Sequence, residues 1–304
     1  MENDIFDLDE LLELRHQVHA LGMASHHLIN TNFTGLYASV FKGQGLNFEE
    51  VREYQAGDDI RNMDWKVTAR TGKAHLKVFK EERERHVILC VDQGAHMHFA
   101  TRGVFKSVQA AKVAALLGWA ALNQHDRVGG IVFAKKAEFF RPSVGRRSLW
   151  QLLKYLTEQQ RHEQADEQDL INVLTKLNQG VNTGSVIFII SDFNRSIQHL
   201  KKHLIQLHQK HTIVLCCIDD AADITLPDMG TLLFHDTANN VIKVNTTDEK
   251  GREAYHTQWL KCRQRLKKDC IQLNVGLIEV NTDDEIHKAL FKGIHDCHNI
   301  GVIH

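Results

Sequence analysis

The sequence predicts an α/β protein whose central sheet is mainly parallel and doubly wound, with helices on both faces. Two observations carry this prediction. The first is a series of continuously apolar runs of strand length, at residues 86–92, 127–133, 185–191, 212–218 and 276–280. The second is that amphipathic helical patterns separate these runs along the chain. Strands that read as unbroken apolar runs are typical of a parallel sheet that is covered on both faces.

The predicted elements follow one another from residue 86 onward. Besides the five strands, we expect helices at 103–124, 146–160, 166–179, 196–210, 252–273 and 283–297, and a short edge strand at 137–141. In the first helix, apolar residues such as Val104, Val108 and Ala111 recur at the spacing of one face, which we expect to point inward. Gly129-Gly130 lies inside the second strand, where it favours close packing of a helix on the sheet.

The first 85 residues contain fewer elements. An amphipathic helix is predicted at 6–23, and short strands are predicted at 34–41 and 76–79. These elements are too few to bury a core alone, so we expect them to pack on the sheet domain. We therefore divide the chain into an N-terminal region, residues 1–85, and a doubly wound domain, residues 86–304.

Composition narrows the possible partners and the cellular location. A chain of 304 residues with 43% hydrophobic content can bury a large core, and its net charge of −1 gives no overall field that attracts nucleic acid. We interpret the basic stretch 250–268 as the solvated face of a helix, and expect no nucleic-acid partner. Six cysteines without a C-x-x-C pair indicate buried thiols in a reducing compartment. No run approaches the roughly 20 apolar residues that span a bilayer. A cytoplasmic location without membrane insertion is predicted.

A dense set of charged and aromatic residues fills the segment 51–70, VREYQAGDDIRNMDWKVTAR. Gly57 permits a turn, and an aspartate after it can cap a helix that we expect to run from residue 60 to 70. On that helix Arg61, Asp64 and Arg70 would lie within reach of one another.

This segment resembles the signature of a bacterial family called domain of unknown function 58. The matching residues are Arg52, Tyr54, Gly57, Asp58, Arg61, Asp64, Trp65, Ala69 and Arg70, and the one departure is Met63 in place of isoleucine. The resemblance implies a von Willebrand A-like domain after the signature and covers nearly the whole chain. Two roles are open for the signature charges, namely an ion network that fixes the junction with that domain and an exposed patch that recognises a partner. The structural role is our expectation.

Two aspartates mark the predicted binding site. Asp92 and Asp192 each follow an apolar strand, and ligands of doubly wound sheets bind beyond the carboxyl ends of the strands, near the point where the strand order reverses. The resemblance implies a metal-ion-dependent adhesion site there. In that site an Asp-x-Ser-x-Ser loop, a threonine and a later aspartate hold a divalent cation, which suits oxygen ligands.

The loop of this chain departs from that pattern, because Gly94 and His96 replace the two expected hydroxyl residues. Three outcomes stay open. The site has no functional metal, it holds a weakly bound Mg²⁺ or Mn²⁺ on Asp92 and Asp192, or it holds a transition metal that His96 helps to bind. The simplest alternative is that both aspartates only cap the loops that follow them. Thr101 or Ser143 could supply the hydroxyl ligand that a threonine provides in the adhesion site.

Motifs for catalysis are absent from the sequence, including phosphate-binding, dinucleotide-binding, hydrolase and zinc-protease patterns. The resemblance implies a non-enzymatic adaptor that partners a MoxR-type AAA+ ATPase in the assembly or remodelling of client complexes. The alternative is a metal-dependent hydrolase or phosphoryl-transfer enzyme. In that case Asp92 and Asp192 would hold the ion, His96 would act as a base, and Arg195 would bind substrate.

Overall fold

The computed structural model describes residues 7–20, 47–55, 58–80, 85–134, 136–158, 167–194, 197–235 and 241–299. The chain forms two compact units. Residues 1–41 and 86–304 make the larger unit, and residues 42–85 make the smaller one. The N-terminal helix α1 (Leu8–Ala20) groups with the large unit, because it packs on α4 (Lys106–Asn123).

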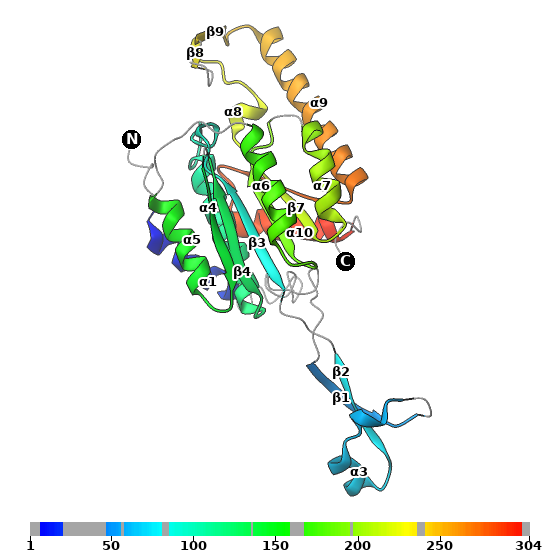
Figure 1. Cartoon of the computed structure of the whole chain (residues 1–304). Coiled ribbons are helices and arrows are strands. Elements are labelled where there is room, and N and C mark those ends of the chain that lie inside the picture. The colour runs from blue at the N-terminus through cyan, green and yellow to red at the C-terminus, as the bar shows by residue number, and fades with distance from the viewer. Residues whose placement is uncertain are drawn as a thin grey trace. The chain divides into compact units, whose positions relative to one another are not determined.

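The large unit is built on a six-stranded sheet (Figure 1). Its strands are β3 (His86–Asp92), β4 (Arg127–Phe133), β5 (Ala137–Ser143), β6 (Val186–Ser191), β7 (Thr212–Asp219) and β10 (Gly276–Asn281). Their order is β10-β7-β6-β3-β4-β5, and every neighbouring pair is parallel except β4 and β5. The predicted α/β, doubly wound fold is therefore confirmed. The chain leaves β3 toward β4 and returns on the other side to β6, so the strand order reverses between β3 and β6.

Helices cover both faces of this sheet. One face carries α4, α5 (Arg147–Glu158) and α10 (Ile286–Asn299), with α1 packed on α4 and α5. The other face carries α6 (Glu167–Gly180), α7 (Lys201–His208) and α9 (Glu249–Leu273). Within the described residues, no helix is both long enough and apolar enough to cross a membrane.

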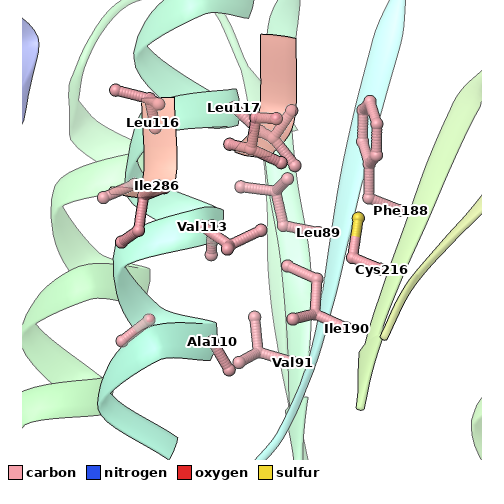
Figure 2. Close-up of a cluster of buried hydrophobic side chains, with 14 of the residues drawn as sticks. Leu89, Val91, Ala110, Val113, Leu116, Leu117, Phe188, Ile190, Cys216 and Ile286 are labelled. Carbon is pink, nitrogen blue, oxygen red and sulfur yellow. The ribbon is translucent and has the colours of Figure 1, made fainter. Parts of the chain in front are cut away.

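Helix α4 forms the centre of the first core. Its side chains Ala110, Val113 and Leu117 face Leu89 and Val91 on β3 (Figure 2). Full burial of each large aliphatic side chain contributes about 1.5–3 kcal/mol. The helix begins three residues later than the predicted start at residue 103, because Gly103 has a φ of 72° and the chain reaches the first turn through a loop.

Helix α1 is held to the same core by its apolar face. Leu11, Leu14 and Val18 are buried, at the spacing of one side of a helix. The indole Nε1 of Trp119, on α4, donates a hydrogen bond to the carbonyl of Leu11 over 3.1 Å. The sequence prediction that this helix packs on the sheet domain is therefore confirmed.

Three parts of the large unit differ from the sequence prediction. The hairpin of β8 (Thr231–His235) and β9 (Val241–Asn245) and the short helix α8 (Ala221–Ile224) were not predicted. The hairpin lacks a strong strand pattern in the sequence, and its apolar residues Leu233, Val241 and Ile242 are more than half exposed. The predicted helix 196–210 is a 3₁₀ turn at Ile197–His199 followed by α7.

The small unit pairs β1 (Asn47–Glu53) with β2 (His75–Lys80) in antiparallel register and carries the 3₁₀ turn η1 (Ile60–Asn62) and helix α3 (Trp65–Thr71) between them. The predicted continuous helix over 60–70 is wrong. Met63 is extended and bridges to Leu76, and Asp64 caps a new helix. Gly57 and the predicted strand at 34–41 lie outside the described residues.

The cysteines match the expectation of buried thiols at five of six positions. Cys90, Cys216, Cys217, Cys270 and Cys297 are buried, whereas Cys262 is exposed on α9, and all six are free. Burial raises the pKa of the Cys90 and Cys216 thiols. Cys90, Cys216 and Cys270 therefore pack as small apolar residues.

We expect Gly130→Ala to destabilise the protein by about 1–3 kcal/mol, because overpacking a closed core forces neighbours to shift. A methyl group at this position would lie 2.3 Å from the Leu89 carbonyl oxygen and 2.4 Å from Leu152 Cδ1 of α5. Urea unfolding measures the effect. Gly180→Ala is the control, because beyond its chain neighbours and the adjacent backbone of its own helix the added carbon has no atom within 4 Å. Equal stability of the two variants would contradict the packing argument.

We also expect the stability of the protein to fall as the pH is lowered from about 6.5 to about 4, with His211 contributing to the loss. His211 is 4% exposed, and neither ring nitrogen has a hydrogen-bond partner among the described residues. Burial, with a smaller contribution from Lys210, lowers its pKa from 6.5 to about 4. In this range the unfolded chain binds the proton and the folded chain does not, so acid favours unfolding.

The measurement is the urea midpoint as a function of pH for the wild type, His211→Leu and the control His203→Gln. The leucine variant should show a flatter profile below pH 6.5, and the control should follow the wild type. An unchanged profile for His211→Leu would show that this imidazole does not contribute to the acid sensitivity.

Candidate functional site

The two predicted aspartates meet at the carboxyl edge of the sheet. Asp92 ends β3 and Asp192 follows β6, the two strands between which the strand order reverses, and both are buried, at 4% and 6% exposure. His96 lies between them. Its Nε2 is 3.1 Å from Asp92 Oδ2 and 3.8 Å from Asp192 Oδ1. The structure thus brings together the three side chains that the sequence nominated for a metal.

The Asp92 carboxylate binds its own loop and the neighbouring strand. Its Oδ1 accepts a hydrogen bond from the backbone N–H of Gly94 over 2.9 Å. Its Oδ2 accepts one from Ser191 Oγ, at the end of β6, over 2.6 Å, and also contacts His96. Asp92 therefore caps the loop that follows it, as the simplest sequence interpretation expected, and also ties β3 to β6.

The Asp192 carboxylate faces a buried cation. Lys106 Nζ donates to Asp192 Oδ2 over 3.1 Å. Asn194 donates its side-chain N–H to the same oxygen over 3.2 Å and its backbone N–H to Oδ1 over 3.3 Å. Burial alone would raise the pKa of Asp192, but the charges of Lys106 and His96 outweigh it, so this pKa is lowered. Asp192 is therefore ionised at neutral pH.

Lys106 is the first residue of α4, and its side chain is only 3% exposed. Its Nζ also donates to Asp223 Oδ2 of α8 over 3.0 Å and lies 5.7 Å from the centre of the Phe99 ring. Burial alone would lower the pKa of Lys106, but Asp192 and Asp223 more than compensate, so its pKa is raised. The ammonium is thus a permanent charge of the site.

Sequence analysis missed Lys106 and Asp223. A lysine at the start of an amphipathic helix is usually solvated, and Asp223 lies 117 positions further along the chain. Ser191 did carry a signal, because it directly precedes Asp192 at a strand end.

The donors around these aspartates do not fit Mg²⁺ or Mn²⁺. Each of the four carboxylate oxygens of Asp92 and Asp192 already accepts a hydrogen bond from the protein. An octahedral ion requires several oxygen ligands at short distance, and the Lys106 ammonium lies beside one of these oxygens. Asp92, His96 and Asp192 lie together, but no three His, Cys, Asp or Glu side chains in the part of the chain that the structure describes have a geometry that could hold a metal ion.

Thr101, one candidate for the missing threonine ligand, binds a different carboxylate. Its backbone N–H donates to Asp220 Oδ2 over 2.9 Å, and its hydroxyl donates to Oδ1 over 2.5 Å. Thr282 Oγ1 donates to the same carboxylate over 2.8 Å, and Asp220 caps α8. Ser143, the other candidate, ends the edge strand β5. Thr101 thus helps to position α8, and with it Asp223.

A second buried ion pair, between Arg263 and Asp219, is connected to the site through Cys217. Arg263 on α9 donates to Asp219 and to the sulfur of Cys217, and Cys217 Sγ donates to the backbone carbonyl of Asp192 over 2.9 Å. Burial raises the pKa of Asp219, while the Arg263 guanidinium opposes the shift. Helix α9 is thereby connected to the loop that carries Asp192.

A cavity of about 240 Å³ lies next to this cluster. Asn194 and Asp223 contribute polar groups to its lining, and Phe193, Tyr255, Trp259 and Leu266 contribute apolar walls. Phe193 has a φ of 47°, a conformation that costs a bulky residue about 1–3 kcal/mol. Trp259 Nε1 is shielded from solvent and has no hydrogen-bond partner among the described residues. The cavity therefore combines aromatic walls with the polar groups of Asn194 and Asp223.

The signature residues of the small unit form local contacts. Arg52 binds both oxygens of Asp58 over 2.8 and 2.7 Å, and Asp58 also accepts from Gln55 N–H over 2.9 Å. The hydrogen bond from Arg52, followed by that from Gln55, lowers the pKa of Asp58. Asp64 accepts from the backbone N–H groups of Lys66 and Val67 and so begins α3.

Other signature residues lie on the surface of the small unit. Arg61 contacts Asp59 over 3.3 Å with its side chain 90% exposed, Trp65 is 68% exposed, and Arg70 is exposed. Tyr54 donates its backbone N–H to Ala74 over 2.8 Å. An interdomain role for these residues stays a prediction.

Comparisons with known proteins place the chain in a family. Uncharacterized proteins of Mycobacterium bovis and Mycobacterium tuberculosis are 27% identical to it over 222 residues, which is 73% of this chain and 70% of each relative. Similar solved structures include the conserved hypothetical protein BatB from Bacteroides thetaiotaomicron, with a TM-score of 0.43, 16% identity, and coverage of 71% of this chain and 99% of BatB. They also include a von Willebrand factor type A protein from Catenulispora acidiphila, with a TM-score of 0.40, 10% identity, and coverage of 85% and 51%.

The sequence model of the family described as "Protein of unknown function DUF58" matches residues 50–265. This match covers the signature segment, the loop after β3 and both strands that carry the aspartates. The chain belongs to the DUF58 family.

Proposed function

We propose that this chain is a non-enzymatic protein-interaction module that docks a partner protein at the carboxyl edge of its sheet. The observation that carries the proposal is the aromatic-walled cavity beside the aspartate cluster. A volume of about 240 Å³ is below the range typical of small-molecule pockets and suits one large side chain of a partner. Pockets that receive a single anchoring side chain commonly supply much of the binding energy of a protein interface.

The charges at this edge favour recognition over catalysis. Lys106 is committed to Asp192 and Asp223 and is almost fully buried, so it is not available to a substrate. A nucleophilic cysteine needs an accessible thiolate, but Cys217 is buried and its pKa is raised by burial and by Asp219. For the alternative of a hydrolase, Arg195 lies outside the described residues, and the oxygens of Asp92 and Asp192 that would hold the ion already accept hydrogen bonds from the protein.

The partner that we propose is a MoxR-type AAA+ ATPase acting on client complexes in the cytoplasm. Family resemblance is one support for this choice. The other is charge, because α9 forms one wall of the cavity and exposes Lys261, Arg265 and Lys268 on its outer side. A partner with an acidic surface around an apolar side chain would complement both features.

We expect Trp259→Ala to weaken binding to a purified MoxR-type ATPase from the same genome by about tenfold or more, because it removes an aromatic wall of the cavity. Biolayer interferometry measures the affinity. Trp150→Ala is the matched control, since Trp150 is 40% exposed on α5, which covers the opposite face of the sheet. Urea unfolding of both variants separates lost contacts from lost stability.

The outcomes distinguish the partner from the surface. If the wild-type chain does not bind the ATPase, the proposed partner is wrong. If it binds and the two tryptophan variants bind equally well, the partner stands and the docking surface lies elsewhere.

A further inference from the structure

We propose that the Lys106 ammonium is the resident cation of this site, supplying the charge that a divalent ion supplies in metal-dependent adhesion sites. The carboxyl edge then keeps its arrangement without a metal. This inference concerns the charge balance within the chain and does not depend on the identity of the partner.

The contacts of the ammonium are those of a bridging cation. Lys106 Nζ lies 3.1 Å from Asp192 Oδ2 and 3.0 Å from Asp223 Oδ2. The side chains of the three residues are 3%, 8% and 15% exposed, so water contributes little to screening these charges. The Phe99 ring lies 5.7 Å from the ammonium and adds a cation–π contact. Two carboxylates and an aromatic ring thus surround one positive charge.

The backbone holds this ammonium in place. Lys106 begins α4, and the following turns of that helix are fixed by Ala110, Val113 and Leu117 against the sheet (Figure 2). This packing fixes the position of the first turn of α4. From there the Lys106 side chain reaches Asp192 and Asp223. The position of the ammonium is therefore set by the packing of α4.

The remaining groups leave little need for a second cation. Asp92 accepts hydrogen bonds from Gly94 N–H and Ser191 Oγ and contacts His96. A divalent ion on Asp192 would lie close to the ammonium and be repelled by it. The two missing hydroxyl ligands and the presence of Lys106 both indicate that this site does not need a divalent ion.

Removing the charge of Lys106 should create a need for a divalent ion. Asp192 and Asp223 would become uncompensated buried carboxylates, which is strongly destabilising. The vacated space would be bordered by carboxylate oxygens, the ligands that hard cations such as Mn²⁺ and Ca²⁺ prefer. Loss of the lysine should therefore make the stability of the protein depend on a divalent ion.

The test compares urea unfolding of the chelator-treated wild type, Lys106→Met and Lys112→Met, each with chelator, Mn²⁺ or Ca²⁺. We expect the wild type to be insensitive to the ions. Lys106→Met should raise the unfolding equilibrium constant by about 100-fold or more, and an added ion should recover part of the loss. Lys112 lies on the same helix and pairs with Glu10, so Lys112→Met controls for loss of a lysine on α4 and should show neither effect.

A double variant keeps the proposal testable if Lys106→Met does not fold. Adding Asp192→Asn removes one carboxylate together with the ammonium and should restore folding, so recovery by this substitution or by an ion supports the proposal. Three results would overturn it. The first is that the wild-type protein binds Mg²⁺ or Mn²⁺ and that Asp192→Asn abolishes this binding. The second is that Lys106→Met is as stable as the wild type. The third is that Lys106→Met loses stability and that neither an ion nor Asp192→Asn recovers it.

Discussion

The buried contact of Lys106 with Asp192 and Asp223 connects the elements that build the carboxyl edge of this sheet. The lysine comes from the start of α4, and the aspartates come from the loop after β6 and from α8. A buried ion pair adds little net stability, but breaking it leaves a charge without a partner, so such pairs select one arrangement over others. Asp92, His96 and Ser191 are built onto this arrangement through direct contacts. The Lys106 ammonium thus links α4 to the loop after β6 and to α8, the elements on which the proposed site is built.

The sheet could be predicted from the sequence because strands that are buried on both faces have no polar positions. The runs at 86–92 and 127–133 match β3 and β4 residue for residue. Asp92 and Asp192 could be nominated because strand ends are visible in the sequence. Lys106 and Asp223 could not, because their pairing joins distant segments and each alone looks like a solvated charge. The prediction of a helix over 60–70 was wrong because of another contact between separate segments. The bridge from Met63 to Leu76 outweighs local helical preference.

The signature of the family divides into residues that build the small unit and residues that lie on its surface. Arg52, Asp58 and Asp64 hold a turn and the start of α3, which is a structural role. Trp65 is 68% exposed, and α3 has no buried residue. A tryptophan that is mostly exposed contributes little to the packing of its own unit, which favours the recognition role for this residue. These local contacts differ from the predicted ion network at the junction with the large unit, so both interpretations of the segment stay predictions.

A site that contains its own cation controls binding differently from a metal-dependent one. In a metal-dependent adhesion site the partner's carboxylate completes the coordination of the ion, so affinity follows the ion concentration. In the docking mode that we propose, the Lys106 ammonium is buried and already paired with Asp192 and Asp223, so the attraction of a partner would come from the surroundings. Those surroundings are the aromatic cavity, which salt affects little, and the basic outer side of α9, which salt screens within about 10 Å at 0.1 M ionic strength. Affinity for an acidic partner should therefore respond to ionic strength rather than to chelators.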